Sequence, residues 1–409
     1  MKQLRIPAAF MRGGTSNAII LHRRDLPAAR DDWEEIFLAA MGSPDPNARQ
    51  LNGMGGGISS LSKVCIVELS DRPDADVDYT FAQVSPRDDW VSYAALCGNM
   101  SAAIGPFAVD EGLVATDGDE AHIRIHNTNT GIIIHAHFAM DEGQAAVDGD
   151  YAMIGVAGTG APQRLDFIEP GGAITGKLLP TGNLVDMVEI PGLGTIEASL
   201  VDAGNAFAFV EAGVFGLTGT ESPGEIDTQP GLLEAIETAR NHMGVLMGLS
   251  ASPEESRAKL PNQPKIAMVS APQDAVLLSG ETARAADGDL SARIVSSGNC
   301  HRALPLTGAL CTSVAARIEG TVAHRLARSP ETPDADIRLM QPSGIMDLKP
   351  VVVHEKDGWK AESVGVYRTH RRMFDGYVYV PAARVPRLVA ATTGEQSAAA
   401  TTEQSAAAE

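Results

Sequence analysis

The chain has 409 residues, of which 44% are hydrophobic and 21% charged, so it is long enough for two globular domains and too apolar for global disorder. Its formal net charge of −20 argues against nucleic-acid binding, which needs a concentrated basic face. There is no signal-like start and no uninterrupted apolar run of about 18 residues, so we expect a cytoplasmic protein without membrane association.

Short β-branched segments separated by Gly, Pro and Asp turns dominate the chain and predict a strand-rich α+β fold. Clear examples are residues 19–21, 64–69, 123–125 and 132–138. Helical signals are fewer and predict helices over residues 31–41, 97–109, 231–249 and 307–318. The end of the chain, residues 389–409, contains an imperfect tandem repeat of polar residues and Ala and is expected to be disordered.

The first segment with potential chemistry is Arg12-Gly-Gly-Thr-Ser16. It combines a cation, two glycines and the hydroxyls of Thr15 and Ser16, a set that suits carboxylate binding through side-chain and backbone donors. Such turns are frequent, so this segment alone is weak support for a site.

The second segment is the glycine run that follows Asn52 and leads to Ser62 and Lys63. It is not a nucleotide loop, because Lys63 follows Ser62 rather than Gly and no Walker Ser or Thr comes after it. The run leads directly into the apolar residues 64–67, which would hold Lys63 at the mouth of a strand, where burial and nearby cations favour the neutral amine. An ordinary solvated lysine is the alternative.

The four cysteines form no CxxC pair, so neither a disulfide framework nor a zinc ribbon is expected. Cys65 and Cys311 lie in apolar segments and fit buried packing. Cys97 differs, because Gly98 and Asn99 follow it where a helix should start. Unpaired N–H groups and the positive end of the helix dipole there favour a thiolate and bound anions.

An internal echo links Cys97-Gly-Asn-Met-Ser-Ala-Ala-Ile with Thr307-Gly-Ala-Leu-Cys-Thr-Ser-Val. It predicts two related domains, each with a central helix whose N-terminus points at a shared site. Chance similarity between two common helix starts is the alternative. His301 and Arg302 precede the second start and could recognise an anion, whereas one His and one Cys do not make a metal site.

Six segments together resemble the PrpF family, in order from about residue 5 to residue 385. They are Arg12-Gly-Gly-Thr-Ser, Asn52-Gly-Met-Gly-Gly with Ser62-Lys63-Val64, Cys97-Gly-Asn, Leu178-Leu-Pro-Thr-Gly-Asn183, Pro342-Ser-Gly344 and Arg368-Thr-His-Arg-Arg372. The family includes 2-methylaconitate cis-trans isomerases, oxalomesaconate tautomerases, and aconitate and methylitaconate delta-isomerases.

The resemblance implies the diaminopimelate epimerase-like fold: two similar strand-rich barrel domains, each around a central helix. We place these domains at residues 1–184 and 185–376, with a final strand at about 377–388 that returns to the first domain. The site is then expected between the domains, where both helix N-termini meet.

By the same resemblance, Lys63 and Cys97 are the catalytic pair, and no cofactor or metal is implied. The substrate-binding residues that we expect around them are Arg12, Thr15, Ser16, Asn17, Ser62, Gly98, Asn99, Met100, His301, Arg302, Thr307 and Gly308. The expected activity is a cofactor-independent isomerisation, by allylic proton shift or cis-trans change, of a small unsaturated di- or tricarboxylate such as aconitate, 2-methylaconitate or oxalomesaconate.

In the expected mechanism, Lys63 removes a proton next to a double bond and carboxylate, and Cys97 or Lys63 returns one to an allylic position. N–H groups at Asn99, Met100 and Gly308 stabilise the dienolate. Arg12, His301 and Arg302 are expected to help as cations.

Two departures from the family pattern bear on the substrate: Asn17 replaces a usual Lys, and Leu96 replaces a usual Asn. Thr307 stands where two-thiol epimerases carry their second cysteine, which disfavours inversion by opposed thiols. A thiol-based epimerase or racemase that uses Cys300, and a non-catalytic carboxylate-binding homologue, are the alternatives. Association of two copies into a homodimer is a further possibility.

Overall fold

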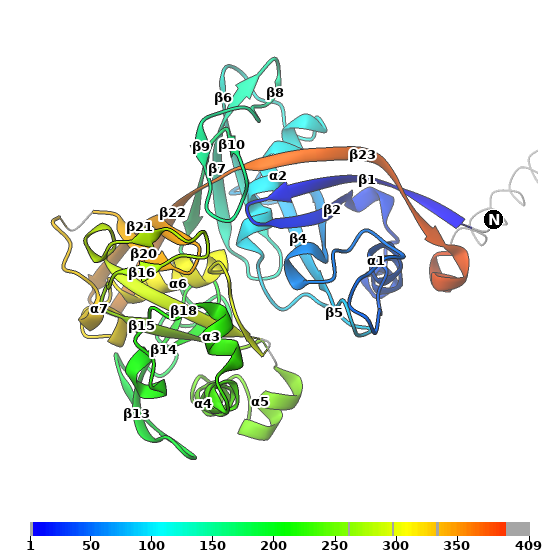
Figure 1. The fold of residues 1–409 in the computed structure, drawn as a ribbon. Coiled ribbons are helices and arrows are strands. Elements are labelled where there is room, and N and C mark those ends of the chain that lie inside the picture. Colours follow the sequence, from blue (N-terminus) through cyan, green and yellow to red (C-terminus); the bar gives the residue numbers. More distant parts are fainter. Residues whose placement is uncertain (1–2, 261, 297, 333–334, 390–409) are drawn as a thin grey trace, which may run out of the picture.

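The computed structural model describes residues 3–260, 262–296, 298–332 and 335–389. The chain forms two strand-rich halves, one blue to cyan and one green to yellow in Figure 1, each around a central helix. Among these residues, none of the helices combines the length and the apolar character needed to span a bilayer. The tail that we expect to be disordered lies outside the described residues, except for Val389.

The first half wraps a sheet around helix α2 (Gly98–Asp110). This helix is rich in Ala and Gly and is buried on all sides from Gly98 to Val109. A second helix, α1 (Trp33–Met41), packs on the outer face of the sheet. The main strands are β1 (Gln3–Gly13), β2 (Ser16–His22), β3 (Lys63–Leu69), β4 (Val77–Val84), β6 (Glu120–Asn127), β7 (Ile133–Asp141) and β11 (Gln163–Ile168).

Side chains on the strands alternate between the two faces. On β3, Cys65 and Val67 belong to the core around α2, whereas Val64 and Ile66 belong to the core under α1. Because both faces are covered, this strand reads as a continuous apolar run. Lys63 shares the face of Cys65 and therefore points toward the α2 side.

The second half is built around α6 (Leu306–Ala315), which is also entirely buried, with α4 (Leu232–Leu246) outside. Its main strands are β12 (Asp186–Ile190), β13 (Gly194–Asp202), β14 (Ala206–Glu211), β15 (Lys265–Ser270), β18 (Leu290–Ser296), β20 (Ile337–Gln341), β21 (Gly344–Glu355) and β22 (Gly358–Arg368). The shorter elements of this half are α3 (Pro223–Thr228), α5 (Pro253–Lys259), α7 (Val322–Leu326), β16 (Ala275–Val276), β17 (Thr282–Ala283) and β19 (Asn299–Cys300). Those of the first half are β5 (Val91–Ser92), β8 (Gln144–Ala145), β9 (Tyr151–Ala152) and β10 (Thr159–Gly160).

The two halves repeat the same order of strand pairings. In the first, β1–β2 is antiparallel, β2–β3 parallel, β3–β4 antiparallel, β4–β6 parallel, and β6–β7 and β7–β11 antiparallel. In the second, β13–β14 is antiparallel, β14–β15 parallel, β15–β18 antiparallel, β18–β20 parallel, and β20–β21 and β21–β22 antiparallel. The internal echo in the sequence is therefore a repeat of the fold.

Two strand contacts join the halves. Strand β11 pairs antiparallel with β22, from Gln163 opposite Arg368 to Ile168 opposite Ser363. Strand β23 (His370–Pro381), orange in Figure 1, then returns to the first half and pairs with β1 along its whole length. The expected span of 377–388 for this strand is wrong at both ends. Residues 371–379 are exposed or half-buried on both faces of the strand, so no apolar alternation marks it in the sequence.

Candidate active site

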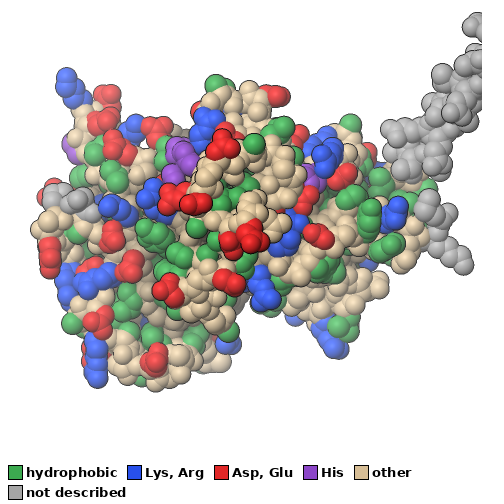
Figure 2. Space-filling view, turned by 90° about the horizontal axis from the view of Figure 1, so that it is seen from above, with side chains coloured by type: hydrophobic (Ala, Val, Ile, Leu, Met, Phe, Trp, Pro, Cys, Tyr) green, Lys and Arg blue, Asp and Glu red, His purple; other side chains and the backbone are tan. Residues whose placement is uncertain are grey.

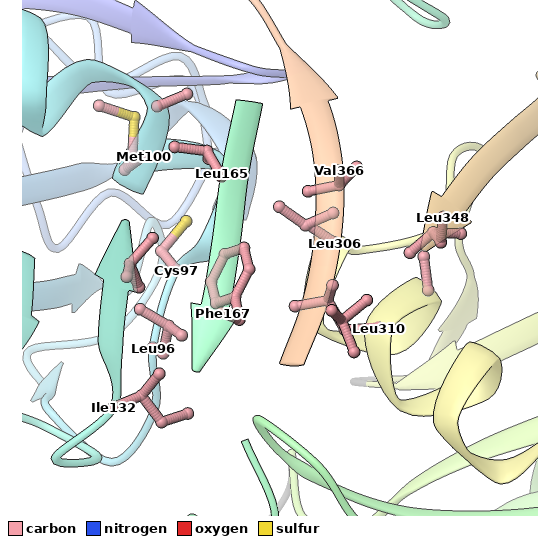
Figure 3. Close-up of a cluster of buried hydrophobic side chains, with 14 of the residues drawn as sticks. Leu96, Cys97, Met100, Ile132, Leu165, Phe167, Leu306, Leu310, Leu348 and Val366 are labelled. Carbon is pink, nitrogen blue, oxygen red and sulfur yellow. The ribbon is translucent and has the colours of Figure 1, made fainter. Parts of the chain in front are cut away.

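The starts of α2 and α6 meet between the two halves. A Cβ atom built on Gly98 would lie 3.0 Å from Cδ2 of Leu306, so the first turns of the helices are in contact. Figure 3 shows Cys97 next to Phe167 of β11, and Leu306 next to Val366 of β22. The first N–H groups of each helix have no acceptor within their own helix. Two positive helix ends therefore converge in one buried region.

The helix starts correct one of our residue assignments. Cys97 is the N-cap of α2, and Pro305 is the N-cap of α6. Two positions later, Asn99 donates to Thr15 Oγ1 at 3.0 Å, and Thr307 accepts from Asn205 Nδ2 at 3.0 Å. Thr307 thus corresponds to Asn99, and Pro305 stands at the position of Cys97. Gly308 follows Thr307 as Gly98 follows Cys97, which is why the sequence pattern aligned the wrong residues. The residue at the position of Cys97 is Pro305, which is also not a thiol.

Gly308 also differs from expectation, because its N–H donates to Pro305 O at 2.8 Å. It is therefore already used within the first turn of α6. The N–H groups of Leu306 and Thr307 occupy the open positions instead.

The β1–β2 turn packs directly on the start of α2. A Cβ atom on Gly13 would lie 2.6 Å from Asn99 O, and one on Gly14 would lie 2.4 Å from Asn99 Oδ1. Gly14 also has a φ of +52°, which favours glycine. The turn and Asn99 are thereby held together, and the Thr15 hydroxyl is brought to the helix start.

Lys63 is buried, with 7% of its surface exposed. Its Nζ donates to Gln83 Oε1 at 2.7 Å and lies 4.9 Å from the centre of the Phe81 ring. The Tyr79 hydroxyl lies 3.8 Å from Cys65 Sγ and donates to Cys97 O at 3.4 Å, so Cys97 is on the same side of the sheet as Cys65 and, by strand alternation, Lys63. The structure therefore brings the two expected catalytic residues into one region.

Lys265 is not among the residues expected from the sequence, and it begins β15 as Lys63 begins β3. Its Nζ donates to Asn262 O at 3.3 Å and lies 5.6 Å from the centre of the Phe207 ring. Burial, followed by repulsion from Lys63, lowers the pKa of Lys265 to about 8. The signal was present in the sequence, since Pro264-Lys-Ile-Ala-Met-Val echoes Ser62-Lys-Val-Cys-Ile-Val.

His301 belongs to the same group of side chains. Burial, followed by repulsion from Lys265 and Lys63, lowers the pKa of His301 to about 4. A pKa this low favours the neutral imidazole at pH 7, which argues against the cationic role that we expect for His301. It can still take part as a neutral hydrogen-bonding group. Arg302 is exposed, and its backbone carbonyl accepts a hydrogen bond from Ser343.

A cavity of about 160 Å³ opens beside the helix starts, between the halves. Residues of both halves line it, among them Thr15, Asn99, Leu304, Gln341 and Arg368. The Asn99 Oδ1 and Gln341 Nε2 atoms are buried without a hydrogen-bond partner in the described structure. Unsatisfied buried polar atoms of this kind are costly, which makes them good candidates for contacts with a ligand.

Arg368 gives this cavity its charge. It is only 5% exposed and donates to Tyr367 O at 2.8 Å, with Met346 Sδ 3.4 Å away. Burial lowers its pKa to about 10, so it stays protonated at neutral pH, and none of its described hydrogen bonds goes to a carboxylate. Asp347 also borders the cavity, and burial raises the pKa of that carboxyl. A buried guanidinium without a carboxylate partner suits a bound carboxylate.

Several expected binding residues lie elsewhere or serve the fold. Arg12 and Asn17 share the hairpin face opposite Met11 and Ala18, which pack around α2. The Arg12 guanidinium donates to three backbone carbonyls, those of Gly14, Thr369 and His370. Among the residues that the structure describes, neither Arg12 nor Asn17 lines the cavity.

Ser62 is fully buried, and its hydroxyl accepts from Gln50 Nε2 at 2.7 Å. The same Gln50 side chain accepts from Gly57 N, so Ser62 helps to fix the glycine-rich loop. Ser16, Leu96 and the Met100 side chain are buried, the last two in the core around α2. Because the Met100 side chain is buried in that core, Met100 can contact a ligand only through its backbone N–H.

Comparison with known proteins agrees with this architecture. The family model described as "PrpF protein" matches residues 3–381. The 3-methylitaconate isomerase of Eubacterium barkeri is 42% identical over 94% of this chain and 99% of its own length. The 2-methyl-aconitate isomerase of Shewanella oneidensis is 35% identical over 93% of this chain and 98% of its own.

A crystal structure of methylitaconate-delta-isomerase superposes with a TM-score of 0.80 at 40% identity, covering 94% of this chain and 98% of that one. The expected two-part α+β architecture is thereby confirmed. The match to the family model, the identities over nearly the whole chain and the shared fold agree: this chain belongs to the PrpF protein family.

Proposed function

We propose that this protein is a cofactor-independent isomerase that moves a proton within a small unsaturated di- or tricarboxylate. Aconitate, 2-methylaconitate, methylitaconate and oxalomesaconate are the candidates of this class. The observation that carries the proposal is the grouping of Lys63 and Cys97 beside two converging helix starts. Isomerases of such acids among the family's members support the reaction class.

In this proposal, Lys63 removes the acidic proton next to the double bond and the carboxylate. The electron pair delocalises over the allylic system, and negative charge grows on the carboxylate oxygens. The N–H groups of Gly98, Asn99, Leu306 and Thr307 stabilise that charge where it forms. Cys97 or Lys63 then returns a proton at the allylic position, which shifts the double bond or changes its geometry.

The cavity would hold a carboxylate remote from the reacting carbon. Arg368 supplies the charge, and Gln341 Nε2 supplies a donor that has no partner in the described structure. Asn99 borders both the cavity and the helix start, so it can link the two parts of the substrate. Binding energy from this remote group then positions the reacting carbon near Lys63.

The thiol-based epimerase is less well supported. The position that corresponds to Cys97 is Pro305, and the spare thiol, Cys300, is only 2% exposed. Burial raises the pKa of Cys300 to about 12, so it is a poor acid or base at neutral pH. A non-catalytic carboxylate-binding protein would not need the paired Lys63 and Cys97.

Proton NMR in deuterated water tests the proposal. We expect one of the candidate acids to exchange an allylic proton for deuterium while the double bond moves. Lys63→Met and Cys97→Ser should each lower kcat by a factor on the order of 100 or more, because each removes an acid or base. Lys356→Met, at an exposed lysine, and Cys300→Ser are the matched controls and should keep activity.

Two results would contradict the proposal. One is full activity in both the Lys63→Met and the Cys97→Ser variants. The other is deuteration with inversion at the α-carbon of an amino or hydroxy acid that is lost in Cys300→Ser, which would favour the epimerase.

The homodimer remains a prediction. Three exposed aromatic residues lie on β23: Phe374, Tyr377 and Tyr379 are each more than 45% exposed. Phe374 stacks on Phe10 of β1, with ring centres 5.6 Å apart. We propose this aromatic strip as the surface through which two copies would associate.

A further inference from the structure

Three histidines gather on two neighbouring strands of the first half, β6 and β7. His122 of β6 lies directly opposite His137 of β7, and His135 is two residues before His137 on the same strand. One ring nitrogen from each lies within 4.8 Å of the others. The ring centres of His122 and His137 are 4.3 Å apart, and those of His122 and His135 are 4.9 Å apart. In the described part of the chain, this is the one group of His, Cys, Asp or Glu side chains with metal-binding spacing.

The alternation of the strands explains why the three rings share a face. Ile123 and Ile125 of β6 and Ala136 of β7 point into the core around α2. Their neighbours therefore point to the opposite, outer face, where His122 is exposed and the other two histidines are half-buried. Figure 2 shows histidine side chains at the surface among charged residues. The group is thus accessible and separated by the sheet from the α2 side, toward which Lys63 points.

A carboxylate completes the group. Asp166 of β11 lies opposite His135, and its Oδ2 is 3.5 Å from His137 Nε2. The same oxygen accepts from Arg164 at 2.9 Å. A carboxylate beside a ligating histidine commonly orients the imidazole or serves as a further ligand. The other histidine of β6 on this face, His126, is already paired with Asp78.

We propose that His122, His135 and His137 form a binding site for a divalent transition-metal ion such as Zn²⁺. Three imidazoles with a carboxylate or water in the fourth position match the preference of zinc, whereas Mg²⁺ and Ca²⁺ prefer oxygen ligands. Zinc–nitrogen bonds of about 2.0–2.1 Å require the rings to close by roughly 1 Å. Because the side chains are at the surface, rotation of the rings is enough.

A bound ion would clamp β6 to β7 on the outer face and stabilise this part of the first half. This site does not depend on the proposed isomerase activity. Its loss should leave turnover unchanged.

Isothermal titration of Zn²⁺ into the untagged full-length protein tests the site, with Mg²⁺ as the unsuitable ion. We expect saturable binding of one Zn²⁺ per chain and none of Mg²⁺. His122→Gln and His135→Gln should each weaken zinc binding at least about tenfold, since loss of a mere supporting residue already costs that much. Visible absorption of the Co²⁺-loaded protein should show the intense bands of a four-coordinate site and lose them in both variants.

His354→Gln, at a histidine on β21 of the second half, is the matched control and should bind Zn²⁺ like the original protein. Cys97→Ser should also keep the affinity, which separates this site from the thiol. Circular dichroism establishes that each variant is folded. Equal zinc affinity in His135→Gln, absence of saturable binding in the original protein, or loss of binding in Cys97→Ser alone would each overturn the proposal.

Discussion

Lys265 begins β15 as Lys63 begins β3, and after burial, repulsion from Lys63 contributes to the lowered pKa of Lys265. An anion bound between them would relieve this repulsion, which gives the site its attraction for carboxylates despite the net charge of −20. With a pKa near 8, Lys265 is charged below that pH and neutral above it. We therefore expect KM for the substrate to rise as the pH increases through about 8. In Lys265→Met, KM should already be high at pH 7 and should lack this rise.

The stability of the fold should increase over the pH range in which substrate binding weakens. The folded-state pKa of Lys265, about 8, is below the ordinary 10.5, so between these values the unfolded chain binds more protons. The free energy of unfolding of the original protein should rise with pH across this window. Lys265→Met should be more stable at pH 7, by on the order of 1 to 3 kcal/mol after allowance for solvent screening. Thermal unfolding of Lys265→Met and the exposed control Lys356→Met, at pH 7 and 10, measures this. If Lys265→Met and the control show the same dependence of KM and of stability on pH, the lowered pKa of Lys265 is refuted.

Among the secondary-structure elements, the contact of the β1–β2 turn with α2 carries the most consequence. Gly13 has no room for a methyl group, because a Cβ atom would press on the carbonyl of Asn99 and the Cα of Met100. Gly13→Ala should therefore destabilise the protein by about 1–3 kcal/mol and lower kcat/KM, since it displaces the start of α2. Gly213→Ala is the control, because a Cβ atom there meets nothing within 4 Å. Calorimetry and kinetics of both variants measure the difference, and a neutral Gly13→Ala would show that the turn yields freely.

In the whole molecule, the first half is not contiguous in sequence. Strand β1 pairs with β23 from Gln3 to Gly13, and β11 pairs with β22, so both partner strands come from the end of the chain. We therefore predict that a fragment of residues 1–184 lacks cooperative unfolding, because one side of β1 is unpaired. Mixing it with a fragment of residues 185–389 should restore a cooperative transition and resistance to proteolysis. A cooperative transition in the first fragment alone would contradict this view of the domains.

Much of the architecture could be read from local sequence. The apolar run after Lys63, the alternation in 132–138 and the small-residue stretch after Cys97 each appear as the expected strand or helix. Lys63 and Cys97 stand at the start of such elements, as expected, and their catalytic roles stay predictions. The echo between the helix starts also indicated the repeat, although it aligned Thr307 with Cys97 two residues out of register.

Local sequence by itself therefore determined the α+β class, the repeat and the two residues at element starts, because hydrophobic patterning and capping act over short stretches of chain. Only the tertiary structure decided which side chains influence one another: Lys63 lowers the pKa of Lys265, Arg368 and Gln341 line the cavity, and Arg12 and Asn17 lie away from it. In the cavity, Thr15 and Asn99 lie beside Gln341 and Arg368, more than 200 positions away in the chain. Such contacts depend on strand pairing and on the face to which each side chain points, and a local pattern does not record which distant face it will meet.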